Sequence, residues 1–127
     1  MCSYIRDGIF PIQEVISNII FSLDKKANCD RIYNGHSVRM NSLRYQVFAL
    51  KGTTCVHCGV SGEYFALEKD VTHNTNRFHF NLYATINGEE VMITKDHIIP
   101  KAKGGSDCLD NLQPMCIHCN ESKRDKC

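Results

Sequence analysis

Two pairs of cysteines constrain this chain more than any other feature of its sequence. Cys55 and Cys58 form one C-x-x-C pair, and Cys116 and Cys119 form a second. A C-x-x-C turn places two sulfurs on one side of a metal ion, and two such turns complete the tetrahedral four-sulfur shell of Zn²⁺. Because a filled shell leaves no open coordination position, we expect this zinc to be structural rather than catalytic.

Two alternatives to a four-cysteine zinc site stay open. The pairs could be redox dithiols or disulfides, although cysteines in a cytoplasmic protein mostly stay reduced. His57 and His118 lie inside the two C-x-x-C turns and could replace a cysteine as ligand. Residues 59–115 separate the pairs, which is longer than the usual short zinc ribbon. We therefore expect a functional hairpin inserted between the two turns.

Length and composition place the chain among ordinary globular proteins. It has 127 residues, of which 43% are hydrophobic and 23% charged, so one modest core is expected. No apolar run approaches the length of a membrane span. The N-terminus, beginning Met1-Cys2-Ser3-Tyr4, lacks the basic and then apolar order of a signal peptide. We expect a cytoplasmic protein without a membrane partner.

The net charge of +1 hides an uneven distribution. Residues 25–54 contain Lys25, Lys26, Arg31, Arg39, Arg44 and Lys51 against Asp30 alone, whereas residues 55–96 are net acidic. A basic segment beside an acidic one is typical of a polyanion contact next to a cation-binding region. Two ordinary solvated faces would give the same distribution.

Hydrophobic periodicity and turn residues predict the elements. We expect helices over 11–24 and 43–50, the second capped by Ser42, and a short C-terminal helix from the second cysteine pair to about Asp125. Hairpins are expected at 30–40, around Asn34-Gly35, and at 78–98, around Asn87-Gly88. A further strand is expected over 63–68, and loops over 25–29 and 103–107.

Four short motifs carry the chemistry. In chain order they are Asp96-His97-Ile98-Ile99-Pro100, Gly104-Gly105-Ser106, Asp110-Asn111-Leu112 and Cys119-Asn120-Glu121-Ser122-Lys123. Together with the cysteine pairs they closely resemble the HNH nuclease family over about residues 52–126. The resemblance implies an α+β protein with a ββα-metal core, stapled by a four-cysteine zinc site. Residues 1–54 would be a helix and basic hairpin extension, and residues 55–127 the nuclease domain.

The same residues suit phosphodiester hydrolysis. The reaction needs a base to activate water and positive charge at the phosphate. An imidazole such as that of His97 is the usual base at neutral pH. Asp96 is a hard anionic ligand and Asn120 a neutral oxygen ligand, and together they leave most of an octahedral Mg²⁺ shell for water and phosphate.

The resemblance also assigns roles. It implies that His97 is the general base, that Asp96 and Asn120 bind the catalytic metal, and that Asn111 braces the loop that orients the base. This H-N-N variant lacks the histidine cluster of colicin-type DNases, so Mg²⁺ or Mn²⁺ is expected. Because neighbouring strand residues point to opposite faces, we expect the strand to end, bulge or twist at Asp96 and His97.

Nucleic acid, with double-stranded DNA the first candidate, is the expected partner. Candidate phosphate contacts are Arg31, Arg39, Lys101, Lys103, Lys123 and Arg124, each of which could equally be a solvated charge. Parts of the chain resemble HNH proteins encoded by bacteriophages, which would place it in host cytoplasm. A dimer is possible. The competing hypothesis is a non-catalytic zinc module that binds nucleic acid or protein.

Overall fold

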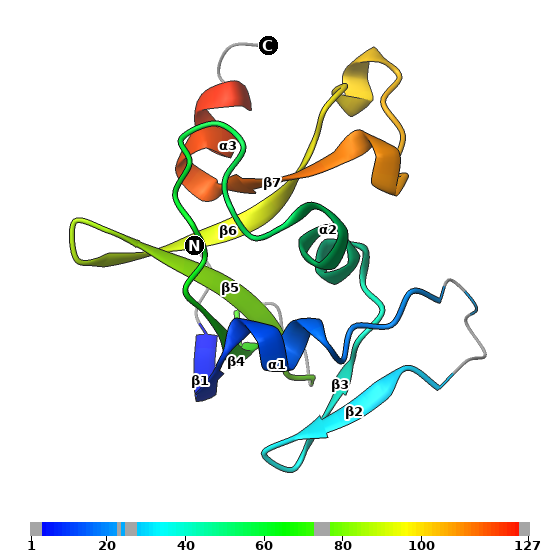
Figure 1. Ribbon diagram of the computed structural model, residues 1–127, viewed down its shortest axis with the longest axis vertical. Helices are drawn as coiled ribbons and strands as arrows, with labels where there is room; N and C mark the ends of the chain where they lie inside the picture. Colours follow the sequence, from blue (N-terminus) through cyan, green and yellow to red (C-terminus); the bar gives the residue numbers. More distant parts are fainter. Residues whose placement is uncertain (1–3, 23, 25–27, 73–76, 125–127) are drawn as a thin grey trace.

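The chain folds around one antiparallel sheet in a computed structural model that describes residues 4–22, 24, 28–72 and 77–124 (Figure 1). The sheet has the strand order β1-β4-β5-β6-β7. Its strands are β1 (Tyr4–Phe10), β4 (Tyr64–Asp70), β5 (His79–Ile86), β6 (Glu89–His97) and β7 (Leu112–Cys116). The other elements are the hairpin strands β2 (Asp30–Tyr33) and β3 (His36–Arg39), the helices α1 (Ile12–Ile16), α2 (Leu43–Lys51) and α3 (Ile117–Arg124), and two short 3-10 turns at Lys101–Lys103 and Leu109–Asn111.

The elements with strong local signals are confirmed. Asn34 and Gly35 have φ of 50° and 81°, and Asn87 and Gly88 have 52° and 81°, which is the tight turn that such pairs favour. Ser42 caps α2 by accepting a hydrogen bond from the Tyr45 N–H at 3.3 Å. The predicted α+β class and the ββα unit, formed by β6, β7 and α3, are present.

The helix predicted over residues 11–24 is wrong in extent, because α1 ends at Ile16. The side chains that follow Ile16 compete with the helix for a backbone carbonyl group. Ser17 Oγ and Asn18 Nδ2 both donate to the Glu14 carbonyl at 3.0 Å, a local bond that favours leaving a helix. The Ile20 N–H then donates to the Met40 carbonyl at 2.9 Å, so the chain turns towards the β2–β3 hairpin.

Two strands, β1 and β7, were not predicted. Most of β1 is exposed, so its sequence lacks the alternation of a half-buried strand. β7 contains Pro114, which argues against a central strand but is allowed at a sheet edge, where β7 lies. β7 pairs with β6 in regular register, with Asp96 opposite Gln113 and His97 opposite Leu112.

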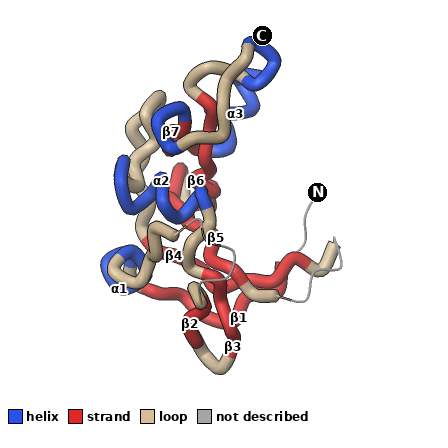
Figure 2. The backbone as a smooth tube through the Cα atoms, turned by 90° about the vertical axis from the view of Figure 1, so that its right-hand side faces the viewer, coloured by secondary structure: helices blue, strands red, loops and turns tan. Residues whose placement is uncertain are grey.

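One hydrophobic core joins the two halves of the sequence. Phe80 on β5 lies at its centre, with ring centroids of four aromatic residues 4.7–6.4 Å away in edge-on contacts: Phe10, Tyr33, Tyr45 and Phe65. Three of these four rings come from the first 54 residues, which therefore pack on the sheet. Figure 2 shows α1 and α2 on the same side of the sheet.

Several predictions fall outside the described residues. These are the loop around 25–27 with Lys25 and Lys26, the end of the last helix at Asp125, and the side chain of Arg124. Within the described ranges, no helix is long and apolar enough to cross a lipid bilayer.

Candidate active site

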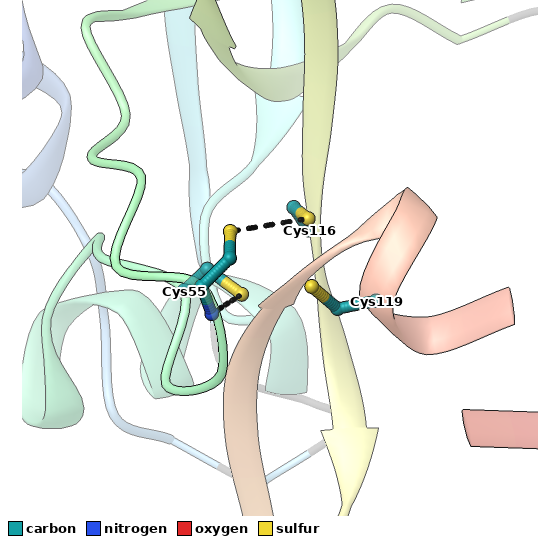
Figure 3. A group of neighbouring side chains, drawn as sticks. Cys55, Cys116 and Cys119 are labelled. Atoms are coloured by element: carbon teal, nitrogen blue, oxygen red, sulfur yellow. Dashed lines mark hydrogen bonds between the residues drawn. The ribbon is translucent and has the colours of Figure 1, made fainter. Parts of the chain in front are cut away.

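The two cysteine pairs meet at one point. The four Sγ atoms of Cys55, Cys58, Cys116 and Cys119 lie within 4.8 Å of one another, and those of Cys58 and Cys116 are 3.8 Å apart (Figure 3). The first pair lies in a turn after α2, and the second spans the end of β7 and the start of α3. All four are free thiols. This group can hold a metal ion such as zinc, and neither His57 nor His118 belongs to it.

The environment of the cysteine cluster favours a cation. Burial opposes ionisation of Cys55, but backbone N–H groups, with that of Cys58 the strongest, lower its pKa to about 6. Burial, together with hydrogen bonds from neighbouring thiols, raises the pKa of Cys119 well above its usual range. Four thiolates at this separation repel one another, so a divalent ion that binds all four would offset the repulsion.

A cavity of about 340 Å³ lies where β6 meets α3. β6 ends at His97, as expected, and pairs with β7 in regular register up to that residue, and its last three residues all line this cavity. Its lining consists of Lys95, Asp96, His97, Pro100, Lys101, Asn120 and Lys123. The structure thus brings together the predicted base, both predicted metal ligands and two of the predicted phosphate contacts.

Asp96 is 7% exposed and its carboxylate is already engaged on one side. Asp96 Oδ2 accepts hydrogen bonds from Gln113 Nε2 at 2.9 Å and from Lys123 Nζ at 2.7 Å. Lys123 Nζ also donates to the His97 carbonyl at 2.6 Å. The ammonium group of Lys123, on α3, therefore compensates the charge of the buried Asp96 carboxylate near the end of β6.

Asn120 is oriented by a short chain of hydrogen bonds. Its Nδ2 donates to Thr94 Oγ1 at 3.1 Å, and Thr94 Oγ1 donates to the Met115 carbonyl at 2.9 Å. With the amide nitrogen occupied, the Asn120 oxygen is the acceptor left for a ligand. One carboxylate and one amide oxygen at the same cavity fit a hard divalent cation such as Mg²⁺ or Mn²⁺.

His97 has a carboxylate partner that the sequence analysis missed. Its Nε2 lies 2.6 Å from Asp107 Oδ1, and Lys101 Nζ lies 3.1 Å from Asp107 Oδ2. The hydrogen bond from His97, followed by the one from Lys101, lowers the pKa of Asp107. Asp107 follows the Gly104-Gly105 turn, and only closure of the loop between β6 and β7 brings it back to His97. This contact engages Nε2, so Nδ1 is the ring nitrogen of His97 that does not contact Asp107.

Asn111 spans the loop between β6 and β7. Its Oδ1 accepts from the Ile99 N–H at 2.8 Å, and its Nδ2 donates to the carbonyls of Ile99 at 3.1 Å and Ser106 at 2.8 Å. The loop is closely packed there, because a Cβ at Gly105 would lie 1.7 Å from the Ile99 carbonyl oxygen. Asn111 does not line the cavity, and it holds the loop that carries Asp107.

The remaining candidate phosphate contacts lie in different places. Lys103 is exposed in the first 3-10 turn, outside the cavity lining. Arg31 and Arg39 are exposed on opposite strands of the β2–β3 hairpin. Arg31 donates to the Asp30 carbonyl at 2.8 Å, and Arg39 donates to Asn41 Oδ1 at 2.9 Å.

Comparison with known proteins agrees with this geometry. A family model described as HNH endonuclease matches residues 79–126, which contain β5, β6, β7 and α3. The mouse (Mus musculus) protein named DNA annealing helicase and endonuclease ZRANB3 is 33% identical over 103 residues. That alignment covers 68% of this chain and 10% of the mouse protein, so the chain spans about a tenth of that relative's length. No solved structure matches the chain. Residues 79–126, which contain the ββα unit, are therefore an HNH endonuclease domain of this chain.

Proposed function

We propose that this protein is an endonuclease that hydrolyses phosphodiester bonds of double-stranded DNA with one divalent metal ion and His97 as the general base. The observation that carries the proposal is the cavity at the end of β6, which His97, Asp96 and Asn120 line together with Lys101 and Lys123. A base, two oxygen ligands and two cations at one cavity are the groups that phosphodiester hydrolysis requires.

His97 takes the proton from the attacking water. Its contact with Asp107 through Nε2 holds the ring, so Nδ1 is the atom that accepts the proton. A positioned base of this kind is worth about 10²–10⁴ in rate. The Asp107 carboxylate then lies beside the imidazolium that forms and stabilises its charge.

Asp96 and Asn120 would hold Mg²⁺ or Mn²⁺ through their oxygens, and the bound ion would stabilise negative charge on the phosphate and the leaving oxygen. Lys101 and Lys123 add positive charge on the same cavity. The cysteine cluster would hold a structural zinc that ties the turn after α2 to β7 and α3. The cytoplasm is the proposed place of action of this protein.

A plasmid-nicking assay tests the proposal. Wild type should convert supercoiled DNA to open circles with Mg²⁺ or Mn²⁺ and not with EDTA, and His97→Ala should lose this activity. His118→Ala is the matched control, because His118 is an exposed histidine on α3 outside the cavity lining. Cleavage by His97→Ala at the wild-type rate would remove the general-base assignment.

Metal dependence of the ligand variants separates their roles. Asn120→Ala should regain part of its activity at high Mn²⁺, because Mn²⁺ binds nitrogen and oxygen ligands less selectively and other donors can replace one neutral oxygen. Asp96→Ala should regain less, since it also removes the negative charge of the site. Equal rescue of both variants would argue against Asp96 as the charged ligand.

The competing function is a zinc module that binds nucleic acid without cutting it. The contact between Lys123 and Asp96 favours it, because the carboxylate has a cationic partner without any metal. Absence of cleavage by zinc-loaded wild type on DNA and RNA, across Mg²⁺ and Mn²⁺ concentrations, would support this module.

A further inference from the structure

A second hollow of about 620 Å³ lies beside the active-site cavity. Its walls come from the end of β3, the first turn of α2, the end of β4, the start of β5 and β6. The charged residues of its lining are mostly basic: Arg39, Arg44, Arg77 and Lys95, with Asp70 as the acidic member. We call this feature the basic groove.

The sheet opens to form the basic groove. β5 and β6 pair from Ile86 and Glu89 only as far as Leu82 and Ile93. Beyond that pair β5 continues beside β4, with His79 opposite Glu68, whereas β6 continues beside β7. The two strands therefore diverge towards the carboxyl end of β6, and the groove lies where they separate.

Lys95 connects the basic groove to the active site. It lines both the groove and the cavity that contains Asp96 and His97. The Lys95 side chain is half-buried. It forms no hydrogen bond or ion pair with any residue in the described part of the chain. No carboxylate in the described part of the chain neutralises the Lys95 ammonium group, so its positive charge stays available to an anion at the junction of the groove and the cavity.

Two arginines of the groove are held in place by neutral acceptors. Arg44 donates to the Phe80 carbonyl at 2.5 Å, and Arg39 donates to Asn41 Oδ1 at 2.9 Å. Arg77 forms an exposed ion pair with Asp30 at 3.1 Å. Since Arg39 and Arg44 have no carboxylate partner in these contacts, their charges stay available to an external anion.

We infer that the basic groove binds the sugar-phosphate backbone of the nucleic acid on one side of the scissile phosphate, with Lys95 contacting the phosphate nearest the active site. The inference deepens the proposed function, because it identifies how the substrate reaches the catalytic residues. A polyanion fits a groove in which Lys95, Arg39 and Arg44 offer their charges, and the continuity through Lys95 favours the nucleic acid over an acidic peptide. Of the two hairpin arginines, only Arg39 lines the groove.

Binding without cleavage tests the inference. The 127-residue protein is titrated into a fluorescent DNA duplex in EDTA, and anisotropy gives the Kd at several salt concentrations. Lys95→Gln and Arg39→Gln should each weaken binding and reduce the salt slope by about 0.9, because each removes one phosphate contact. Arg31→Gln removes the same charge from the same hairpin outside the groove, and its slope should stay at the wild-type value.

Three outcomes would overturn the inference. They are an unchanged slope in both groove variants, an equal loss in Arg31→Gln and Arg39→Gln, or displacement of DNA by poly-glutamate more effectively than by unlabelled duplex at equal charge. Arg39 is exposed, so its variant should fold even if Lys95→Gln does not. Wild type that binds DNA through the groove but never cleaves it would leave this inference standing and refute the proposed nuclease.

Discussion

Asn111→Ala should destabilise the loop between β6 and β7 by a measurable amount. The substitution removes the three side-chain hydrogen bonds to Ile99 and Ser106. Each such bond contributes about 0.5–1.5 kcal/mol, and about 0.7 kcal/mol per bond applies because these atoms are accessible to water. The free energy of unfolding should therefore fall by about 2 kcal/mol. The loop carries Asp107, so cleavage should fall as well, because His97 loses its orientation.

Urea unfolding followed by circular dichroism measures the effect. With a slope of about 2 kcal/mol/M for a small protein, the midpoint should fall by about 1 M. Asp110→Ala is the matched control, because Asp110 is the exposed neighbour of Asn111 in the same 3-10 turn. If Asn111→Ala lowers the midpoint no more than Asp110→Ala does, the three hydrogen bonds do not stabilise the loop and this reasoning fails.

Three further predictions follow from other parts of the structure. Cys119→Ala should lose bound zinc and unfold at lower temperature, whereas Cys108→Ala, an exposed free cysteine, should keep both properties, as measured by elemental analysis and thermal melts. In a His97→Ala background, Lys123→Met should bind Mn²⁺ more tightly by electron paramagnetic resonance, because Asp96 loses its ammonium partner; weaker binding would contradict this. Burial lowers the pKa of His79 below its unfolded value of 6.5, so the unfolded state takes up the proton first and stability should fall as pH decreases through 6.5. His79→Gln should reduce the difference between urea midpoints at pH 7.5 and 5.5, and an unchanged difference would exclude His79 as the cause.

The elements that the sequence predicts well are those with local causes. The turns at Asn34-Gly35 and Asn87-Gly88 and the cap at Ser42 depend on residues a few positions apart. The extent of α1 was wrong because Ser17 and Asn18 bond to a backbone carbonyl, which hydrophobic spacing does not report. β7 was missed since Pro114 suits a strand only at a sheet edge.

The candidate site likewise contains residues that local motifs predict and residues that only the folded chain brings together. Asp96, His97 and Asn120 were predicted from short motifs as site residues, and the structure places all three on the lining of one cavity. Asp107 was missed as a partner of His97, because only closure of the β6–β7 loop brings the two within 2.6 Å. Lys95 was missed because its significance comes from the divergence of β5 and β6, which no local pattern in the sequence records.

The turn that carries Cys55 and Cys58 also covers the outer edge of the sheet. β7 is the edge strand, and the Val56 N–H donates to the Pro114 carbonyl of this strand at 3.1 Å. Release of metal from the cysteine cluster would free this turn and uncover a row of backbone groups that another chain could pair with. Pro114 has no N–H to offer such a chain, which limits the pairing. Metal loss should therefore lead to slow self-association through β7.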